Sequence, residues 1–558
     1  MKKYTYDVEK NIHINMDGKQ LNYSDGGEEE RKLMQIASSG VDLSTFSEDL
    51  SGTMSSWPTE YHFSKKRHLV VRQFGIKAGD KVLELGAGCG SVTRYLAEIG
   101  AEVTSVEGTA ARAAVNGKRC KDFPNVKVYV DNITQFETDE KFDWILMIGV
   151  LEYSPKYAST QNPPDEYLSI AKKLIKPNGK FVLAIENKLG IKYMNGASED
   201  HNGKIFYGPE DLYNKKDITT WGKSELKNIL NTSGFISTEF HSTFPDYKLP
   251  TLLINESADQ HINFRSEELL HYIKSHDYRG NHKRLYEESF MAASLRKNGI
   301  LSNFANSFVI VSSLHENSIS SNELATYYSI GRKKQYCTKT IFNVENNQII
   351  VTKKLLNESH QNTDFDITLQ DNQVITIKHN INPSSQYIHG QMLGYIYSKA
   401  QKRSDAVDVT TALNVWVDVL KNEFKFYSRT DQSEIQSDQI NGNSISNILI
   451  DGKAIDCGMH NIIINAEEAK PFDLEWITDS KVPLVWVLVR NITVAAREDF
   501  KIMTKVKLET IVNYVAKQLN VTVNDADILD AKKMEKIFGL NISKRERSDS
   551  LPLVSMLG

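Results

Sequence analysis

The sequence predicts an α/β fold with an open, mostly parallel sheet for the first half of the chain, and an α+β fold for the rest. In the first half, an apolar strand at 82–85 meets glycines at every second position and then an amphipathic helix. Further apolar runs of strand length follow in order, separated by helical or turn segments, as in open α/β sheets. The second half opens instead with strands that are close neighbours in the sequence, which favours antiparallel pairing.

The turn at Gly86, Gly88 and Gly90 predicts a nucleotide pocket. Glycine permits both the tight turn and the close approach of a ligand, because it has no Cβ. A strand, a glycine turn and a helix N-terminus together present backbone N–H groups and a positive dipole end at one point. The spacing is G-x-G-x-G, not the G-x-G-x-x-G of dinucleotide-binding folds, and acidic Glu84 precedes the first glycine.

Polar residues also follow the ends of the next strands, where ligands bind in open α/β sheets. Glu107 ends the strand after the glycine turn, at a position where an acid can accept both ribose hydroxyls. Asp131 and Asn132 follow the third strand, and Glu152 follows the fourth. A turn is expected at 174–179, before a fifth strand at 180–185.

This order of motifs resembles class I S-adenosylmethionine-dependent methyltransferases, through LELGAGCG at 83–90, GVLEYS at 149–154 and LIKPNG at 174–179. The resemblance implies a seven-stranded, Rossmann-like sheet whose last strand is antiparallel, closed by strands at 235–241 and 304–311. It also implies S-adenosylmethionine as the cofactor. The residues that it assigns to cofactor binding are Glu84, Gly86, Ala87, Gly88, Gly90, Glu107, Gly108, Asp131, Asn132, Tyr61 and Arg67. The alternative is a Rossmann-like domain that binds NAD or nothing.

In the resemblance, each part of the cofactor has its own residues. Glu84 holds the amino-acid end, Glu107 accepts the ribose hydroxyls, and Asp131 with Asn132 reads the adenine amino group. Tyr61, His62 and Arg67, in a helix ahead of the first strand, are candidates for a lid over the cofactor. A simple role in capping the sheet is the alternative for these three residues.

Composition limits the partners and the compartment. The chain has 558 residues, a net charge of −4 and a pI near 6.4, so nothing favours nucleic-acid binding electrostatically. The four cysteines lie far apart, which argues against a disulfide framework and a zinc site. Neither a signal peptide nor an apolar run long enough to cross a membrane is recognisable. We expect a cytoplasmic protein, or one attached peripherally to the inner face of the membrane.

The chain divides by composition into four parts. We expect a polar extension with one helix at 1–45, the methyltransferase domain at 46–315, a linker at 316–322 and a second domain at 323–558. An insertion at 245–300 lies within the first domain. Because long insertions near a cofactor pocket commonly shape the acceptor site, we expect that role here.

The loop after the fifth strand concentrates acids around one histidine. The candidate catalytic residues are His201, Glu152, Glu199 and Asp200. His201 is the first choice for a base that takes the proton of a sugar hydroxyl, and Glu152 is the second. A phosphate or carboxylate acceptor would need no base, and Lys192 or Arg67 would then matter more. Alternatively, Asp200 and His201 only fix the loop by local hydrogen bonds. No metal is expected at this site.

Three longer runs, WPTEYHFS at 57–64, AIENKLGIKYMNGASEDH at 184–201 and FPDYKLP at 244–250, extend the resemblance. They resemble methyltransferases of bacterial surface-polysaccharide biosynthesis. This resemblance implies a glycan or nucleotide-sugar acceptor of the lipopolysaccharide O-antigen or capsule type, with glycosyltransferases of the assembly as partners. The alternative is a non-catalytic scaffold of such an assembly.

In the second half, Asp456, Asn461 and Asp473 have the order and spacing of a kinase catalytic loop and its metal-binding acid. Together with Lys353 on a strand, they make the region resemble the protein-kinase and aminoglycoside-phosphotransferase fold. The resemblance implies ATP, with Mg²⁺ held by Asn461 and Asp473. Two features depart from it: no His or Arg immediately precedes Asp456, and Gly331 is the sole glycine near the expected phosphate loop.

Two functions remain open for this second half. In a bifunctional protein it would phosphorylate a glycan terminus that the first domain then methylates. Otherwise it would recognise the glycan or dock a partner enzyme.

Overall fold

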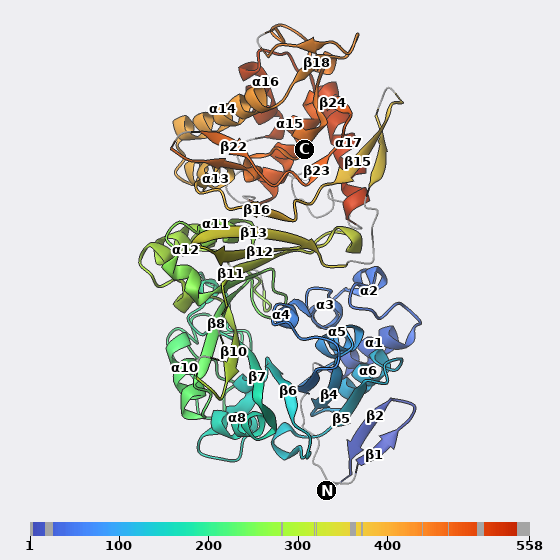
Figure 1. Ribbon diagram of the computed structural model, residues 1–558, viewed down its shortest axis with the longest axis vertical. Coiled ribbons are helices and arrows are strands. Elements are labelled where there is room, and N and C mark those ends of the chain that lie inside the picture. The colour runs from blue at the N-terminus through green and yellow to red at the C-terminus, as the bar shows by residue number, and fades with distance from the viewer. Residues whose placement is uncertain are drawn as a thin grey trace. The chain divides into compact units, whose positions relative to one another are not determined.

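The computed structural model describes residues 4–16, 26–280, 283–316, 318–319, 321–357, 364–369, 372–437, 439–466, 468–498 and 507–543. The chain forms two compact units, Met1–Ile262 with Ile273–Tyr327, and Asn263–Tyr272 with Tyr328–Gly558 (Figure 1). A short part of the insertion expected at 245–300 therefore belongs to the second unit, while the remainder stays in the first.

The first unit is built on one sheet with the strand order β1-β2-β5-β4-β3-β6-β7-β10-β8-β9-β11. The strands are β1 (Tyr4–Asp7), β2 (Ile12–Asn15), β3 (Lys81–Leu85), β4 (Glu102–Glu107), β5 (Val126–Val130), β6 (Phe142–Ile148), β7 (Ile175–Glu186), β8 (Ser237–Phe244), β9 (Leu252–Asn255), β10 (Ser307–Ser313) and β11 (Glu323–Ser329). Strands β3 to β7 pair in parallel, whereas β10 runs antiparallel to both β7 and β8. The strands from β5 to β8 in this order confirm the expected Rossmann-like sheet. Its last strand along the chain is β10, which runs antiparallel to both of its neighbours.

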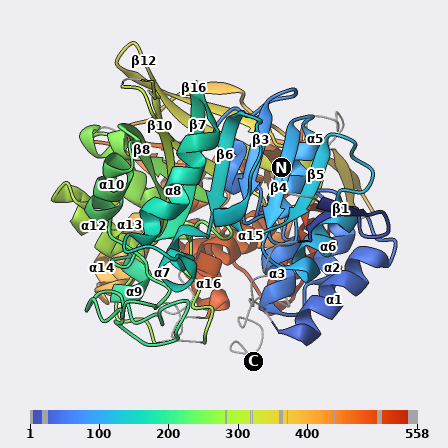
Figure 2. The ribbon, with the colours of Figure 1, turned by 90° about the horizontal axis from the view of Figure 1, so that it is seen from below.

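Two helices between parallel strands lie next to the cofactor motifs. Helix α5 (Ser91–Glu98) follows the glycine turn, α6 (Ala110–Arg119) follows β4, and both pack on β4. Figure 2 shows β5, β4, β3, β6 and β7 side by side within this sheet. The remaining helices are α1 (Gly27–Ser38), α2 (Glu48–Thr53), α3 (Trp57–Phe63), α4 (Leu69–Arg72), α7 (Ser154–Tyr157), α8 (Pro163–Leu174), α9 (Ile191–Met194), α10 (Lys223–Thr232) and α12 (Glu288–Lys297).

Two local expectations for the first unit differ from the structure. The first residues form a hairpin of β1 and β2, with β2 parallel to β5, in addition to the expected helix. These strands were missed because each is only four residues long, too short for the alternation of Ile-His-Ile-Asn in β2 to stand out. The turn expected at 174–179 is the first part of β7, with an irregular register opposite Phe142 and Trp144.

The second unit contains four small groups of strands: β12-β13-β16, β14-β15-β23, β17-β21-β22 and β19-β18-β20-β24. They are β12 (Thr338–Glu345), β13 (Gln348–Leu355), β14 (Phe365–Thr368), β15 (Val374–His379), β16 (Ser384–Gln386), β17 (Gln391–Met392), β18 (Phe426–Ser428), β19 (Glu434–Ile435), β20 (Ile448–Asp451), β21 (Ile462–Ile464), β22 (Ala469–Pro471), β23 (Trp476–Ile477) and β24 (Lys481–Pro483). Its helices are α11 (Ser266–Leu269), α13 (Leu393–Lys402), α14 (Ala406–Glu423), α15 (Leu484–Glu498), α16 (Leu508–Gln518) and α17 (Asp525–Ile542).

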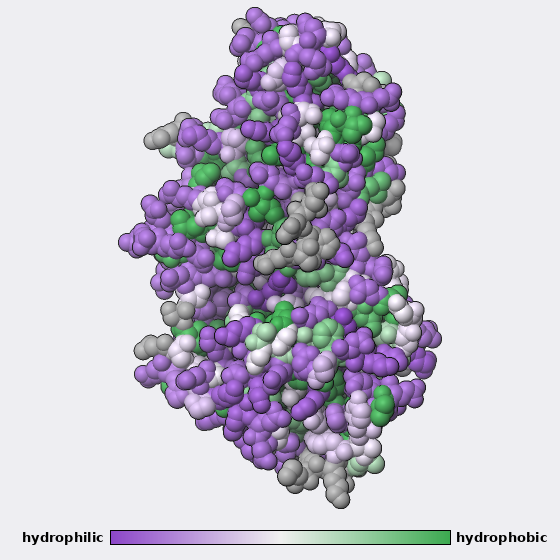
Figure 3. All heavy atoms as spheres, turned by 45° about the vertical axis from the view of Figure 1, so that its right-hand side comes forward, coloured by the Kyte–Doolittle hydropathy of each residue, from purple (hydrophilic) through white to green (hydrophobic). Residues whose placement is uncertain are grey.

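Local sequence signals identify several of these elements. Asn346 and Asn347, both with positive φ, form the turn that joins the antiparallel strands β12 and β13. Helix α16 matches the apolar periodicity of 508–519, and its residues Val512 and Val515 are fully buried. Residues 544–558 lie outside the part of the chain that the structure describes. The described part of the chain has no helix of the length and apolarity needed to cross a bilayer. Figure 3 shows a face on which hydrophilic residues predominate.

Candidate active site

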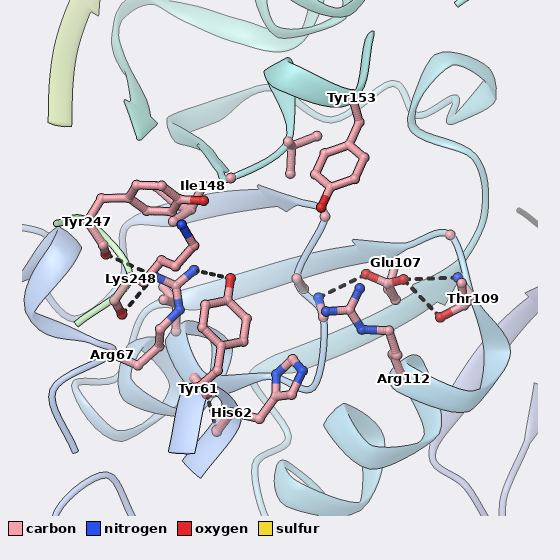
Figure 4. A pocket seen from close by; sticks show the side chains of 18 of the residues that line it. Tyr61, His62, Arg67, Glu107, Thr109, Arg112, Ile148, Tyr153, Tyr247 and Lys248 are labelled. Atoms are coloured by element: carbon pink, nitrogen blue, oxygen red, sulfur yellow. Dashed lines mark hydrogen bonds between the residues drawn. The ribbon is translucent and has the colours of Figure 1, made fainter. Parts of the chain in front are cut away.

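A cavity of about 520 Å³ lies at the carboxyl ends of β3, β4 and β6 in the first unit (Figure 4). Its lining includes the glycine turn after β3, residues 107–109 after β4 and residues 148–150 after β6. Helix α3 contributes Tyr61 and His62. Figure 4 shows Glu107 and Thr109 on one side of the cavity and Tyr247 and Lys248 on the opposite side.

The glycine turn forms one wall. Gly86, Ala87 and Gly88 line the cavity, and both glycines have positive φ, at 79° and 56°. A Cβ on Gly86 would collide with the side chain of Val150. Gly90 lies behind the wall as the N-cap of α5, where a Cβ would collide with Asn116. Gly86 and Gly90 therefore allow close packing against Val150 and Asn116, whereas Gly88 leaves room beside the Arg112 side chain in the cavity.

Glu107 is a fixed acceptor beside this turn. Its carboxylate accepts hydrogen bonds from the Gly88 N–H at 2.9 Å, and from the N–H and the hydroxyl of Thr109 at 3.0 Å each. These bonds hold the buried carboxylate in place while Gly108 and Thr109 line the same wall. A carboxylate has about four acceptor positions and three are used here, so one remains for a ribose hydroxyl.

Glu84 lines the cavity from the end of β3 and accepts a hydrogen bond from the Thr93 hydroxyl at 2.5 Å. Burial raises the pKa of Glu84 to about 7. A cationic group placed beside it would favour its ionised form and offset the cost of that burial. The site therefore suits an ammonium group, such as the one at the amino-acid end of S-adenosylmethionine.

Asp131 and Asn132 do not line the cavity, although Ile133 does. The Asp131 carboxylate accepts hydrogen bonds from the Tyr4 hydroxyl at 2.7 Å and from the Asn15 amide at 2.9 Å. Asn132 accepts a hydrogen bond from the Thr134 N–H and so caps the short helix at 133–135. The N-terminal hairpin, which the sequence did not reveal, holds Asp131 away from the expected contact with adenine.

Arg67 and Tyr61 line the cavity and are bonded to each other. The Arg67 guanidinium donates to the Tyr61 hydroxyl at 2.9 Å and to the carbonyls of Tyr247 and Lys248 at 3.1 and 3.3 Å (Figure 4). It also lies over the Tyr61 ring. Arg67 thus ties α3 to the segment that carries Tyr247 and Lys248.

The side of the cavity away from Glu107 is built from paired acids and lysines. The Lys248 ammonium contacts Glu186 and, at 2.6 Å, Asp200. The Lys192 ammonium lies 3.1 Å from Asp200 and 3.5 Å from Asp246. Asp200 and Lys248 line the cavity, whereas Lys192 is fully buried behind them.

Three further groups meet beside this network: Glu152, Glu186 and His201. Burial and the neighbouring Glu186 raise the pKa of Glu152 to about 8, so Glu152 is largely protonated at neutral pH. Burial alone would lower the pKa of His201, but Glu186, Glu199 and Glu152 outweigh it and hold that pKa above its ordinary value. His201 lines the cavity, and both glutamates are fully buried.

Glu199 has a different place from the other catalytic candidates. Its carboxylate accepts hydrogen bonds from the N–H groups of His201 at 2.9 Å and Asn202 at 2.7 Å, and it does not line the cavity. These bonds fix the turn that carries His201. Glu199 is therefore a positioning residue for His201.

Several lining residues were missed from the sequence. They are Trp57, Thr109, Arg112, Tyr153, Tyr278 and Arg279. Thr109 and Arg112 come directly after Glu107 at the start of α6, so the strand-end rule could have identified them. Tyr278 and Arg279 belong to the insertion, where no periodic pattern indicates which residues turn inward.

The second unit contains a separate polar cluster. Its buried Lys353 ammonium contacts Asp473 and, at 2.6 Å, Glu475. Asn461 donates to the carbonyls of Asp456 at 2.9 Å and Asp473 at 3.3 Å. The four residues singled out from the sequence, Lys353, Asp456, Asn461 and Asp473, are thus linked by direct bonds or through Glu475.

Asp456 and Glu475 are held by further partners that the sequence motif did not include. Asp456 accepts from the Glu475 N–H and from the Arg490 guanidinium, each at 3.1 Å. The Arg332 guanidinium lies 2.6 Å from the Glu475 carboxylate. Both carboxylates are therefore ion-paired as well as buried.

Known proteins that are similar to this chain match it in the first unit, where the cavity lies. A family model described as "Methyltransferase domain" matches residues 76–234. Demethylmenaquinone methyltransferase of Tropheryma whipplei is 32% identical over 117 residues, which cover 21% of this chain and 46% of that protein. Pavine N-methyltransferase of Thalictrum flavum is 31% identical over 86 residues, which cover 15% and 24%. The chain thus spans less than half of the length of these curated relatives.

Among solved structures, phosphoethanolamine N-methyltransferase 2 of Haemonchus contortus is 16% identical, with 45% of this chain and 52% of that chain covered and a TM-score of 0.27. The CcbJ methyltransferase of Streptomyces caelestis is 16% identical, with 49% and 98% covered and a TM-score of 0.29. The family-model match, the strand order and the glycine turn agree on one conclusion. Residues 76–234 form a class I S-adenosylmethionine-dependent methyltransferase domain.

Proposed function

We propose that this protein transfers the methyl group of S-adenosylmethionine to a hydroxyl of a bacterial surface glycan or of its sugar precursor. The observation that carries the proposal is the two-sided cavity. One side offers Glu84, the glycine turn and Glu107 to a nucleoside with a charged amino-acid end, and the other offers His201, Asp200 and Lys248 to an acceptor.

Methyl transfer from a sulfonium is an in-line displacement, so the protein mainly has to align the reactants and exclude water. The acceptor oxygen forms a bond to the methyl carbon while the carbon–sulfur bond breaks, and its electron pair stays on sulfur. The hydroxyl proton leaves to a base. His201 is the candidate base that lines the cavity, and Glu199 fixes the turn that carries it.

The acceptor side favours a sugar over an apolar substrate. Rings of Trp57 and Tyr278 lie together there, with centroids 3.9 Å apart, and Lys248, Asp200 and Arg279 line the same region. Flat aromatic faces combined with charged hydrogen-bonding groups suit a polyhydroxylated ring. The sequence resemblance to surface-polysaccharide methyltransferases supports the same acceptor class.

Calorimetry with S-adenosylmethionine and S-adenosylhomocysteine tests the cofactor side. We expect binding well below millimolar concentration, and no binding would refute the proposal. Mass spectrometry of the surface glycan, with and without the protein, tests the acceptor. Loss of a methyl increment supports the proposal, and an unchanged glycan contradicts it. Cofactor binding without glycan methylation would favour a scaffold or another acceptor.

A second candidate function is a bifunctional protein that also phosphorylates the glycan terminus. The observation in its favour is the direct bonding among Lys353, Asp473 and Asn461, which would hold ATP and Mg²⁺ in kinase-type chemistry. The side chain of Asp473 is 41% exposed and thus accessible to a ligand. Asp456, by contrast, is paired with Arg490, so it would accept a hydroxyl proton only through its remaining lone pairs.

ATP turnover by the full chain tests this second function, with Asp473→Ala as the variant. We expect turnover that disappears in the variant. Turnover that survives would remove the basis of the kinase assignment. A glycan that loses a methyl phosphate, rather than methyl alone, in cells lacking the protein would independently favour the bifunctional account.

A further inference from the structure

Glu152, Glu186 and His201 form a cluster of possible metal ligands, which the methyltransferase motifs did not predict. One ligand atom from each residue lies within 4.8 Å of the other two. Glu152 comes directly after β6, Glu186 ends β7, and His201 is in the following loop. Neighbouring parallel strands bring their ends together, so residues distant in sequence converge here.

These side chains retain unused polar atoms. Oε2 of Glu152, Oε2 of Glu186 and Nε2 of His201 have no hydrogen-bond partner among the described residues. Both carboxyl groups are fully buried. A buried polar atom without a partner is costly, so two such oxygens and one such nitrogen in three adjoining side chains require an explanation.

The lysines nearby do not account for all of this acidity. Lys248 contacts only Oε1 of Glu186, and it shares its charge with Asp200. The hydroxyl of Tyr247 lies 3.4 Å from Oε1 of both Glu152 and Glu186, and so leaves both Oε2 atoms unused. Lys192 is engaged by Asp200 and Asp246. His201 contributes its Nε2 at 3.8 Å from Oε1 of Glu186, so both Oε2 atoms remain open to an additional cation.

We propose that Glu152, Glu186 and His201 bind one divalent cation beside the methyl-acceptor side of the cavity. Two carboxylates and one imidazole suit a first-row ion such as Mn²⁺, and liganding distances of about 2.0–2.2 Å require only a small inward movement of the side chains. The ion would neutralise both glutamates, and His201, which lines the cavity, would place it next to the acceptor side.

This site contradicts the expectation of a metal-free centre, and it changes the task of His201. A metal-bound histidine is neutral and holds the ion, so it is not the base. The ion would instead orient an acceptor oxygen and, as a Lewis acid, lower its pKa, so that its proton passes to the Asp200 carboxylate, which lines the same cavity. The metal site itself does not depend on the proposed methyl transfer. Only the catalytic role of the ion rests on that proposed function.

Titration with MnCl₂, followed by calorimetry and by the loss of the free Mn²⁺ signal in electron paramagnetic resonance, tests the site. The full chain carrying Asp473→Asn is the parent protein, because that change weakens any ion site in the second unit. We expect one Mn²⁺ per chain at micromolar concentration. Glu152→Gln and Glu186→Gln should each weaken binding at least about tenfold.

Two controls separate the site from general effects. Glu239→Gln alters another carboxylate paired with a histidine in the same unit, His241 at 2.9 Å, and should leave Mn²⁺ binding unchanged. Glu107→Ala should keep Mn²⁺ while losing cofactor affinity, so failure of the methyltransferase proposal remains distinguishable. Circular dichroism checks folding. Mn²⁺ binding weaker than millimolar in the parent, or equal in parent and glutamate variants, overturns the proposal.

Discussion

The two units each contain a buried polar cluster, and the clusters differ in how their charges are paired. In the second unit, Glu475 contacts both Lys353 and Arg332, and Asp456 contacts Arg490. In the first unit, Glu152 has no ion pair among the described contacts, and Glu186 has an unused oxygen. In the second cluster Glu475 and Asp456 are each paired with a guanidinium, whereas in the first cluster Glu152 has no such partner in the part of the chain that the structure describes.

The pKa values express this difference. Burial alone would raise the pKa of Glu475, but Arg332 and Lys353 outweigh it and hold that pKa below its ordinary value. For Glu152, burial and Glu186 act in the same direction and raise the pKa to about 8. A paired cluster stabilises the fold in its ionised form, whereas an unpaired one keeps a proton or binds a cation. We therefore expect ligand binding to change the protonation state of the cluster in the first unit.

Glu475→Gln should have the largest effect, because it removes the carboxylate that Lys353 and Arg332 share. Breaking a buried ion pair from one side typically costs about 3–5 kcal/mol. We expect that loss in the free energy of unfolding, measured by urea denaturation of the full chain at neutral pH. A loss below about 1 kcal/mol would mean that the second cluster is not closed by its own charges.

His201→Ala should lower turnover by about a hundredfold to a thousandfold, either by removing the base or by removing a metal ligand. Cofactor affinity should be unchanged, because His201 belongs to the acceptor side. Initial rates at saturating S-adenosylmethionine, with calorimetry on the same sample, separate the two quantities. Normal turnover in this variant would show that the acid cluster takes no part in the reaction.

Glu107→Ala should weaken S-adenosylhomocysteine binding by about tenfold to a hundredfold. It removes an acceptor for the ribose and leaves the Gly88 and Thr109 N–H groups without their carboxylate. Calorimetry gives the affinity, and Glu239→Gln serves as a matched carboxylate control outside the cavity. Equal affinities in wild type and Glu107→Ala would relocate the cofactor site.

The cofactor side could be predicted from sequence, because its determinants are local. Gly86 and Gly88 lie in one turn, and Glu107 ends the adjacent strand, so strand order alone brings them together. Asp131 follows the same rule but does not line the cavity, and Tyr4 and Asn15 from the N-terminal hairpin bind its carboxylate. No spacing rule reveals a partner more than a hundred residues away.

The acceptor side was less predictable for the same reason. His201 and Glu152 were identified as chemistry-bearing residues, but their pKa values depend on Glu186 and Lys248, which arrive from β7 and from the segment after β8. In the second unit, the spacing of Asp456, Asn461 and Asp473 was readable, while Glu475 and Arg490, which pair with Lys353 and Asp456, were not. Sequence motifs therefore identify the chemically active residues, whereas their protonation states depend on the partners that packing brings beside them.

Glu152→Gln should have the smallest effect at neutral pH and the most informative dependence on pH. With chelator present to remove metal, the wild-type side chain is largely protonated, so neutral glutamine replaces it at a cost within about 1 kcal/mol. The folded pKa of Glu152, about 8, lies above its ordinary value of 4.5, so the folded state binds the extra proton between these values. Wild-type stability must therefore fall relative to the variant as pH rises from about 4.5 toward 8. Urea denaturation of both proteins across this window measures the difference, and parallel stability curves would mean that Glu152 is ionised and already paired.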